Sequence, residues 1–454
     1  MSIHKKIRAV LIGCFVFSVI AGRGVYAGET NERKFYTAVS RGLEMKFIKD
    51  PNMTFIHAEL LIFYTDKNVS PAIRRLTMLN IFDEAVNMSG SGLLSTLKRL
   101  GNDFTVVDRP DYLLFRINFL PDKLATFMQF LKGLYSYKAF ALKKFNYSVY
   151  NYWKLFFAGA DWQKQVAFQV AYQKLFPGQL LGNALIIPDQ LLKINLAQIR
   201  SFYQNAYTLP NSLLIIKGNI NNAVAVGSFN VTFKSFKKQP GHRNQGKEKL
   251  TINDSREVII YHIESSNPPE IFWFETILPL SNKNHFPMQV LNDMLFGQPI
   301  GRLSRQAAET GIRFLKMETE IINHSDVSVI CNAVRLDYSE IEKFILAVDN
   351  EKRKLKRIDR REYLDVKNYF CGRLEVDTRR VEYDVEIERD FLAFESDANE
   401  ANASFSQISQ QVTLESLNAV APDPNRGAIV IVGNANLIGR YLTVLKPRII
   451  RYIQ

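Results

Sequence analysis

Cysteine is scarce in this sequence, and its scarcity excludes a fold held together by disulfides. The chain has 3 cysteines in 454 residues, and two of them, Cys331 and Cys371, lie beyond the N-terminal segment. Small secreted scaffolds that depend on disulfides carry far more cysteine, so apolar cores must hold this chain together. The two later cysteines are interpreted as buried free thiols, with one disulfide between them as the alternative.

Histidine is also sparse, and this limits the sites at which a transition metal could bind. No two of the 6 histidines lie within four residues of each other, so neither H-E-x-x-H nor H-x-x-E-H occurs. His57 and His262 each begin an H-x-E triplet, but the P-C-x-x-C partner of zinc deaminases is missing. Each is interpreted as a half-buried histidine beside a surface acid, because residues i and i+2 of a strand share a face. The sequence also lacks a G-x-S-x-G elbow and a glycine-rich phosphate loop.

Long apolar runs are confined to the N-terminus. Residues 1–27 combine a basic start, an apolar stretch and the small residue Ala27 at a cleavage position, as a secretory signal peptide does. The apolar stretch is too short to span a bilayer comfortably, and no later run is long enough. The sequence therefore predicts an exported protein of the bacterial periplasm, without a transmembrane helix in the mature chain. A lipid anchor at Cys14 and an uncleaved N-terminal anchor are the alternatives.

The rest of the composition is that of a folded protein with a basic surface. The chain is 47% hydrophobic and 23% charged, and its length favours two or more domains. Its net charge is +13, and such a surface favours anionic partners such as membrane headgroups or acidic proteins. The basic cluster at 350–365 is interpreted as a solvated helix surface, and no nucleic-acid ligand is expected for an exported protein.

The sequence repeats one plan in two halves. In each half a short apolar strand follows a Pro-Asn turn and ends at a Gly-Asn pair, at Gly218 and at Gly433. Further segments match in the same order, each with an alternating strand that leads into a helix with apolar residues every three to four positions. We expect an α+β fold of two homologous halves, each a mostly antiparallel sheet covered by helices. The predicted parts are a signal peptide at 1–27, an N-terminal half at 34–232, a basic linker at 233–256 and a C-terminal half at 257–454.

Several segments resemble the pitrilysin/insulinase peptidases, a family of zinc enzymes that includes the mitochondrial processing peptidase. The segments are "SPAIRRLTMLNIFDEAV", "LKRLGNDFTVVDRPDYLLFRINFLPDKL" and "LFPGQLLGNALIIPDQLLKINLAQIRSFYQNAYTLPNSLLIIKGNI", and the last is the most specific. The resemblance covers nearly the whole mature chain. It implies two similar α/β halves that pack as a clamshell, usually with a second such chain.

The zinc site that this family uses is lost from the sequence. Active members carry H-x-x-E-H on the first long helix of the first half, where the two imidazoles bind zinc and the glutamate activates water. The resemblance places Arg75 and Leu79 at the histidine positions and Met78 at that of the glutamate. The family's third ligand is a glutamate roughly seventy residues later, but no Asp or Glu occurs from Lys123 to Ala160. We therefore expect no cofactor and no zinc hydrolysis at this site.

The arginine and tyrosine with which active pairs of this family hold substrate are also missing. The stretch "GRLSRQAAETGIRFL" follows the course of the family's stretch but is one residue shorter. The arginine position falls on Ala308, and the tyrosine position falls on Phe314, which has no hydroxyl. Arg305 and Arg313 are the spatial substitutes that the sequence offers.

Aromatic residues stand where the family's third ligand would project. The segment "FNYSVYNYWKLFF" includes Tyr147, Tyr150 and Trp153. One interpretation is a helix core and an interface, because aromatic side chains dominate both. The other is that these side chains line the former metal pocket and keep a cleft for an apolar or extended peptide.

These features together predict an exported, non-catalytic pseudopeptidase. The resemblance implies that it is the inactive partner subunit of an active zinc peptidase and contributes peptide binding and complex assembly. The alternative is a scaffold protein of the cell envelope that uses the same fold as an interaction surface, as a homodimer for example. A working peptidase would need zinc bound by residues that the family does not use.

Overall fold

The structure of the chain is a computed structural model that describes residues 35–451 with several gaps. The gaps are 65–68, 83–91, 102–103, 110, 159–161, 180, 183–192, 238–249, 265–266, 379–388, 391–392, 394–410 and 421–422. The predicted signal peptide 1–27, with Cys14, and the basic part of the predicted linker lie outside the described residues. Among the residues that are described, no helix combines the length and the apolar character needed to cross a membrane.

The first half of the chain forms a six-stranded mixed sheet in the order β1-β2-β6-β3-β5-β4. Neighbouring strands are antiparallel except β2 and β6, which are parallel. Strand β3, in the middle of the sheet, reads IHAELLIF and is buried along its whole length, because both faces of the sheet are covered. The strands are β1 (Phe35–Ser40), β2 (Leu43–Lys49), β3 (Ile56–Phe63), β4 (Phe104–Asp108), β5 (Tyr112–Phe119) and β6 (Ser212–Gly218).

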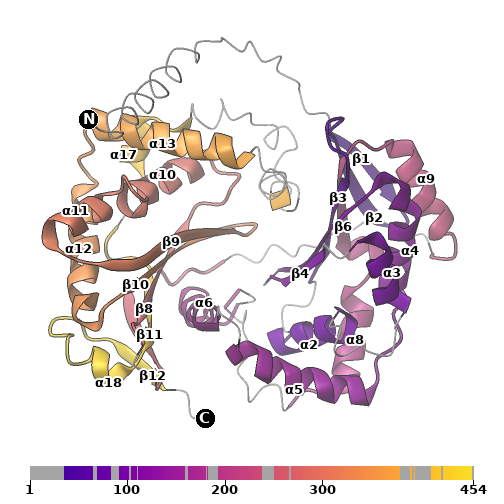
Figure 1. The fold of residues 1–454 in the computed structure, drawn as a ribbon, viewed down its shortest axis with the longest axis horizontal. Coiled ribbons are helices and arrows are strands. Elements are labelled where there is room, and N and C mark those ends of the chain that lie inside the picture. The colour runs from indigo at the N-terminus through magenta and orange to yellow at the C-terminus, as the bar shows by residue number, and fades with distance from the viewer. Residues whose placement is uncertain are drawn as a thin grey trace, which may run out of the picture. The chain divides into compact units, whose positions relative to one another are not determined.

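Helices cover one face of the first sheet and form the first core with it (Figure 1). Phenylalanine rings fill much of this core, with ring centroids 4.8 Å apart for Phe115 and Phe130. The core therefore draws its stability from large buried aromatic surfaces. The helices are α2 (Pro71–Phe82), α3 (Gly92–Leu100), α4 (Leu124–Tyr135), α5 (Leu142–Ala158), α8 (Leu196–Ala206) and α9 (Asn222–Thr232).

The second half forms another six-stranded mixed sheet, in the order β12-β7-β11-β8-β10-β9. From β7 to β9 this order repeats that of β2 to β4 in the first sheet, and β7 and β11 are parallel as β2 and β6 are. Its strands are β7 (Glu257–His262), β8 (Glu270–Ile277), β9 (Phe314–Asn323), β10 (Ser328–Leu336), β11 (Ala428–Gly433) and β12 (Arg448–Arg451). Its helices are α10 (His285–Phe296), α11 (Arg302–Thr310), α12 (Ile341–Lys354), α13 (Arg360–Thr378), α17 (Leu414–Ala419) and α18 (Ala435–Ile438).

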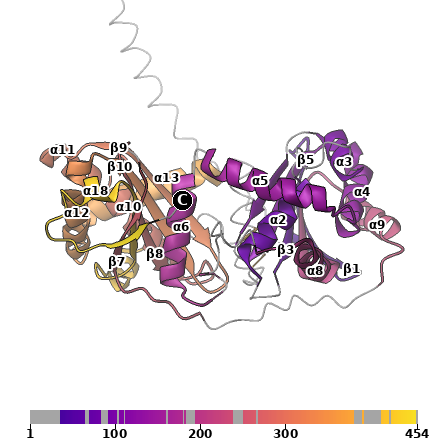
Figure 2. The same cartoon turned by 90° about the horizontal axis from the view of Figure 1, so that it is seen from below.

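Each half also covers the outer face of the other half's sheet. Helix α6 (Trp162–Leu175) belongs to the first half by sequence but packs on β8 and β11 of the second sheet, as Figures 1 and 2 both show. Its residues share a core with the outward-facing residues of that sheet, among them Phe272 and Val430. Reciprocally, Ala393 of the second half packs on the outer face of the first sheet, beside Leu61 and Ile215.

The predicted fold class is confirmed, because both halves are α+β units built on a six-stranded mixed sheet. From the sequence we expected each half to be built only from elements of its own part of the chain. The packing of α6 on the second sheet differs from this expectation. Cys331 and Cys371 are both free; Cys331 is buried, and Cys371 is half-buried.

A glycine before β11 allows a close backbone approach that a side chain would prevent. Gly427 has φ of +101°, and a Cβ atom there would collide with the carbonyl oxygen of Phe274. We expect Gly427→Ala to lower the free energy of unfolding by about 2 kcal/mol, because the backbone must shift or adopt a strained conformation. Gly227→Ala in α9 is the matched control: its Cβ would meet open space, so it should raise stability by about 0.5–1 kcal/mol. Urea unfolding of both variants measures this, and equal stabilities would contradict the assignment.

Candidate functional site

The three degenerate zinc-motif positions lie on α2, and two of them take part in packing. Met78 is buried in the first core, and Leu79 packs against the edge of that core. Arg75 is half-buried one helical turn before Leu79. None of these side chains carries a lone pair that could bind zinc at neutral pH, apart from the weakly donating thioether of Met78.

Asn80 lies on the face of α2 that contacts α5. Its Nδ2 atom donates hydrogen bonds to Ser148 Oγ at 3.0 Å and to the Leu76 carbonyl at 3.0 Å. The hydroxyl of Ser148 donates to the Lys144 carbonyl at 3.0 Å, and Tyr137 donates to the Asn80 carbonyl at 2.9 Å. Asn80 and Ser148 are 68 residues apart, close to the separation that the family resemblance implies between the zinc helix and the third ligand.

This contact does not fit a zinc ion. Zinc sites in proteins use imidazole, thiolate or carboxylate groups, whereas this contact joins an amide and a hydroxyl that hydrogen-bond to each other. In the part of the chain that the structure describes, no three His, Cys, Asp or Glu residues are placed to hold a metal ion. No hydrolytic step through a metal can therefore be derived at this place.

The aromatic residues of α5 do not fill a closed pocket between the helices. Tyr147 is 39% exposed and Tyr150 is 64% exposed. Helix α5 turns Phe145 and Ser148 inward, so these two tyrosines face the opposite way. Tyr147 and Tyr150 therefore do not fill the former metal pocket. That they line a cleft open to solvent stays a prediction, and the side chain of Trp153 lies outside the described residues.

The corresponding positions of the second half also serve packing. Phe314 contacts Phe344 edge-on, with ring centroids 5.6 Å apart, at the margin of the second core. The side chain of Ala308 lies outside the described residues. Arg305 does not stand free for a ligand, because it donates to Glu362 Oε1 at 2.8 Å and so ties α11 to α13.

A fully buried carboxylate lies on β3, where sequence reasoning placed a surface acid. Glu59 has no exposure and His57 is 1% exposed, so the interpretation of this H-x-E triplet as half-buried beside a surface acid is wrong. For the triplet that begins at His262 the same interpretation is confirmed, because the side chain of Glu264 is 91% exposed. The alternation that places His57 and Glu59 on one face holds, but that face is covered by the second half of the chain.

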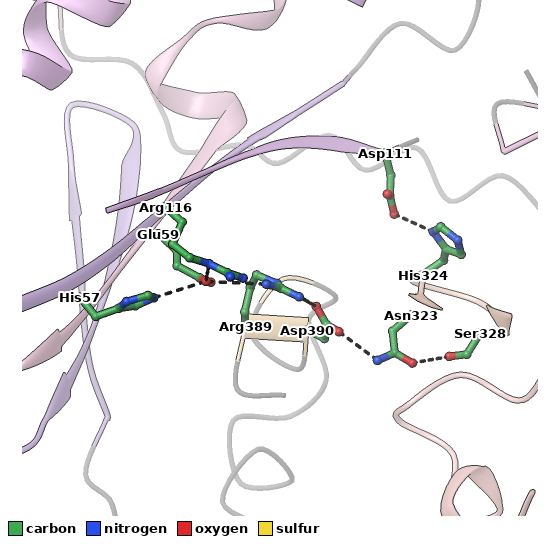
Figure 3. Close-up of polar contacts among 9 residues, drawn as sticks. All are labelled: His57, Glu59, Asp111, Arg116, Asn323, His324, Ser328, Arg389 and Asp390. Atoms are coloured by element: carbon green, nitrogen blue, oxygen red, sulfur yellow. Dashed lines mark hydrogen bonds and ion pairs between the residues drawn. The ribbon is translucent and has the colours of Figure 1, made fainter. Parts of the chain in front are cut away.

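Two arginines neutralise Glu59 (Figure 3). Arg116 Nε on β5 lies 2.9 Å from Glu59 Oε1, and Arg389 Nη1 lies 3.7 Å from the same atom. His57 Nε2 lies 3.4 Å away, while its Nδ1 is 2.6 Å from Asn118 Oδ1. Burial alone would raise the pKa of Glu59, but the hydrogen bond from His57 and the charges of Arg389 and Arg116 outweigh it and hold the pKa below its usual value.

The network continues to the hairpin between β9 and β10. Arg389 pairs with Asp390 at 2.9 Å, and Asp390 Oδ2 accepts a hydrogen bond from Asn323 at 2.9 Å. Beside it, His324 is buried between two groups of the first half. Its Nδ1 is 3.3 Å from Asp111 Oδ2, and its Nε2 is 3.0 Å from the hydroxyl of Tyr172 on α6 (Figure 3 shows the Asp111 contact).

A cavity of about 440 Å³ opens beside these residues. Its walls come from β9 and the residue after it, from the turn between β4 and β5, from α10 and α13, and from Arg389 and Asp390. Three arginines and three acidic residues line it, so it is suited to a ligand that offers both hydrogen-bond donors and acceptors. Sequence reasoning missed this site, although charged residues within apolar strands, such as Glu59 and Arg116, were a signal for it.

Removing the charge of Glu59 should destabilise the protein and change its response to acid. We expect Glu59→Gln to cost about 3 kcal/mol at pH 7, because Arg116 and Arg389 lose a buried counter-charge. The pKa of Glu59 is lower in the folded chain than in the unfolded chain. Its stabilisation is therefore present above the unfolded value of 4.5 and is lost as the pH falls towards the folded value.

Urea unfolding of wild type and variant at several pH values from 7 down to 3 measures both effects. The variant should lose less stability than wild type over this range. Glu264→Gln is the matched control, because it changes the exposed acid of the other H-x-E triplet and should leave stability nearly unchanged. Equal losses in the two variants would contradict the role of Glu59.

Comparison with known proteins supports the family resemblance. A family model described as the Peptidase M16 inactive domain matches residues 193–325. No curated protein sequence matches the chain. Among solved structures, the chain is similar to a protease from Helicobacter pylori, with a TM-score of 0.72 and 13% identity over 88% of this chain and 99% of that one.

Two further solved structures show the same likeness. A peptidase M16 inactive domain from Pseudomonas fluorescens has a TM-score of 0.70 and 16% identity, over 91% of this chain and 100% of that one. A protein from Alicyclobacillus acidocaldarius assigned as M16-like peptidase has a TM-score of 0.68 and 14% identity, over 89% of this chain and 99% of that one. The resemblance to the pitrilysin/insulinase peptidases is confirmed: the chain has the fold of the solved M16 structures, and its residues 193–325 match the family model of the M16 inactive domain.

Proposed function

We propose that this chain is an exported, non-catalytic peptidase homologue that acts as the partner subunit of an active zinc peptidase. The observation that carries the proposal is that Arg75, Met78 and Leu79 occupy the zinc-motif positions of α2, next to a contact with α5 that is made by an amide and a hydroxyl. A peptidase fold that offers zinc no ligand there, but keeps a charged cavity, supports a function in binding.

Peptide binding is the contribution that the proposal assigns to this chain. The cavity beside β9, at about 440 Å³, is within the range of about 300–1,000 Å³ that ligand pockets occupy. In the two-subunit enzymes that the resemblance implies, one chain binds zinc and the other completes the substrate chamber. The proposal assigns the second role, completing the substrate chamber, to this chain.

The proposal places this pair in the bacterial periplasm. Its support is the signal-like segment at 1–27, with its basic start and apolar stretch. Without residues 1–27 the net charge is +9, which favours an active partner with an acidic surface, because complementary charge speeds and orients association.

Coexpression with an H-x-x-E-H homologue from the same organism tests the partnership. We expect the two chains to coelute in size-exclusion chromatography, and the pair to hydrolyse peptides faster than the active subunit alone, because the chamber is then complete. Chelation of zinc should abolish this activity. A glutamate-to-glutamine variant of the active subunit is the control, and it should form the complex without activity. No association and no change in activity would refute the proposal, while association without a change in activity would favour the envelope scaffold.

The chain alone should bind no zinc at the contact between α2 and α5. After dialysis against zinc and removal of the excess, inductively coupled plasma mass spectrometry should detect far less than one zinc ion per chain, because the contact lacks suitable ligands. Asn80→Ala should leave the zinc content unchanged but lower the free energy of unfolding by about 1 kcal/mol, because the hydrogen bond to Ser148 is lost. One zinc per chain that disappears in this variant would contradict the prediction.

A further inference from the structure

Exposed positive charge is concentrated where α12 ends and α13 begins. Six basic side chains are exposed within nine residues, and we call them the basic corner: Arg353, Lys354, Lys356, Arg357, Arg360 and Arg361. Two acids of the same segment, Asp359 and Asp365, are also exposed. Four positive charges therefore stay uncompensated at this surface.

The other two acids of this segment point inward and are balanced there. The side chains of Glu351 and Glu362 are only 8% and 9% exposed. Arg302 of α11 contacts both of them, at 3.8 Å and 2.6 Å, and Arg305 contacts Glu362 at 2.8 Å. The two arginines of α11 thus match these two acids in charge, and the acids do not offset the basic corner from beneath.

Folding gives no reason for the charge of the basic corner. Among the residues that the structure describes, four of its members have no ion-pair partner: Lys356, Arg357, Arg360 and Arg361. Arg360 and Arg361 are also the first residues of α13, where the positive end of the helix dipole disfavours cations. Like charges so close together repel each other. The arrangement therefore lowers the stability of the folded chain, and an anionic partner would offset this loss.

An exposed leucine lies among these charges. Leu364 is 44% exposed, and it follows Arg360 by four positions and Arg361 by three, so the three side chains share one face of α13. Basic residues around an apolar side chain suit the surface of a bilayer, because the cations meet headgroup phosphates while the apolar group enters the acyl boundary. An acidic protein would pair with the cations but would offer the leucine less. The combination favours a lipid surface.

We propose that the basic corner docks this protein on the surface of a bilayer that contains anionic phospholipid. Lys356, Arg357, Arg360 and Arg361 contact the headgroup phosphates, and Leu364 enters the boundary between headgroups and acyl chains. The docking is peripheral and reversible, because it rests on charge that salt can screen. It does not depend on the peptidase partnership of the proposed function.

Cosedimentation with lipid vesicles tests this. The protein is the chain from Gly28, the predicted mature form, because the apolar stretch within residues 1–27 would bind any bilayer. The compact unit that holds both sheets begins at Phe35, so this form retains all of it. The vesicles contain phosphatidylcholine alone, or equal parts of phosphatidylcholine and phosphatidylglycerol.

Binding to the anionic vesicles should be about tenfold or more stronger than binding to the neutral ones, because each cation near an anionic surface adds to the affinity. Most of this difference should disappear when the salt concentration rises from about 0.1 M to about 1 M, because the Debye length falls from about 10 Å to about 3 Å.

Two variants with the same change in net charge separate a local effect from the overall charge of the protein. The first variant combines Lys356→Gln, Arg357→Gln, Arg360→Gln and Arg361→Gln. The control variant combines four exposed lysines of the first half, as Lys138→Gln, Lys143→Gln, Lys234→Gln and Lys237→Gln. The first should bind anionic vesicles about tenfold or more weakly than wild type, and the control should stay within about threefold of it. Thermal unfolding checks the fold of both.

The contribution of the leucine is measured separately. Leu364→Ser should weaken binding to the anionic vesicles about threefold or more, because an apolar contact with the acyl boundary is lost. Leu142→Ser is the matched control, since Leu142 is 62% exposed at the start of α5, far from the basic corner in the sequence, and it should leave binding unchanged.

Equal binding to neutral and anionic vesicles, or equal losses in the two fourfold variants, would overturn the proposal. Leu364→Ser without effect would overturn the contact with the acyl boundary. A chain that ignores vesicles, but whose basic-corner variant no longer coelutes with the active subunit, would show that the corner binds an acidic protein and that the lipid proposal is wrong. A chain that docks on anionic vesicles through the corner but has no peptidase partner supports this proposal and counts against the partnership.

Discussion

The carboxylate of Glu59 has no contact with solvent, and its charge must therefore be balanced inside the protein. Arg116 supplies one cation from the neighbouring strand, and Arg389 supplies another from the second half of the chain. Arg389 also pairs with Asp390, which accepts a hydrogen bond from Asn323 at the end of β9. The charge on β3 is thus satisfied only when segments of both halves are in place, and the walls of the cavity depend on the same contacts.

Both halves join the same two helices through a polar pair. Helices α2 and α5 correspond to α10 and α13, since the strands of the two sheets follow one order. Asn80 and Ser148 form the pair in the first half, whereas Asp293 and Arg373 form a two-pronged ion pair in the second, at 2.7 and 3.2 Å. A polar contact between these helices is therefore part of the scaffold, and its chemistry can change while the fold persists.

Much of the fold could be predicted from the sequence, because strands buried on both faces read as continuous apolar runs such as that of β11. The matching order of the two halves followed from the same runs and from their Gly-Asn ends. The partner of each outer sheet face could not be predicted, since nothing in the sequence of α6 indicates which sheet it covers. For the same reason Glu59 was interpreted as a surface acid: its cation Arg389 is distant in sequence, and only the tertiary structure brings them together.

The reciprocal covering of the sheets has a consequence for how the chain reaches its native state. Ala393, which packs on the outer face of the first sheet, comes late in the chain, whereas the last strand of that sheet ends at Gly218. Until Ala393 packs there, apolar residues of the first sheet such as Leu61 and Ile215 lack this contact. Folding of the first sheet is therefore complete only when residues from near the end of the chain are in place, which raises the sequence separation of its contacts.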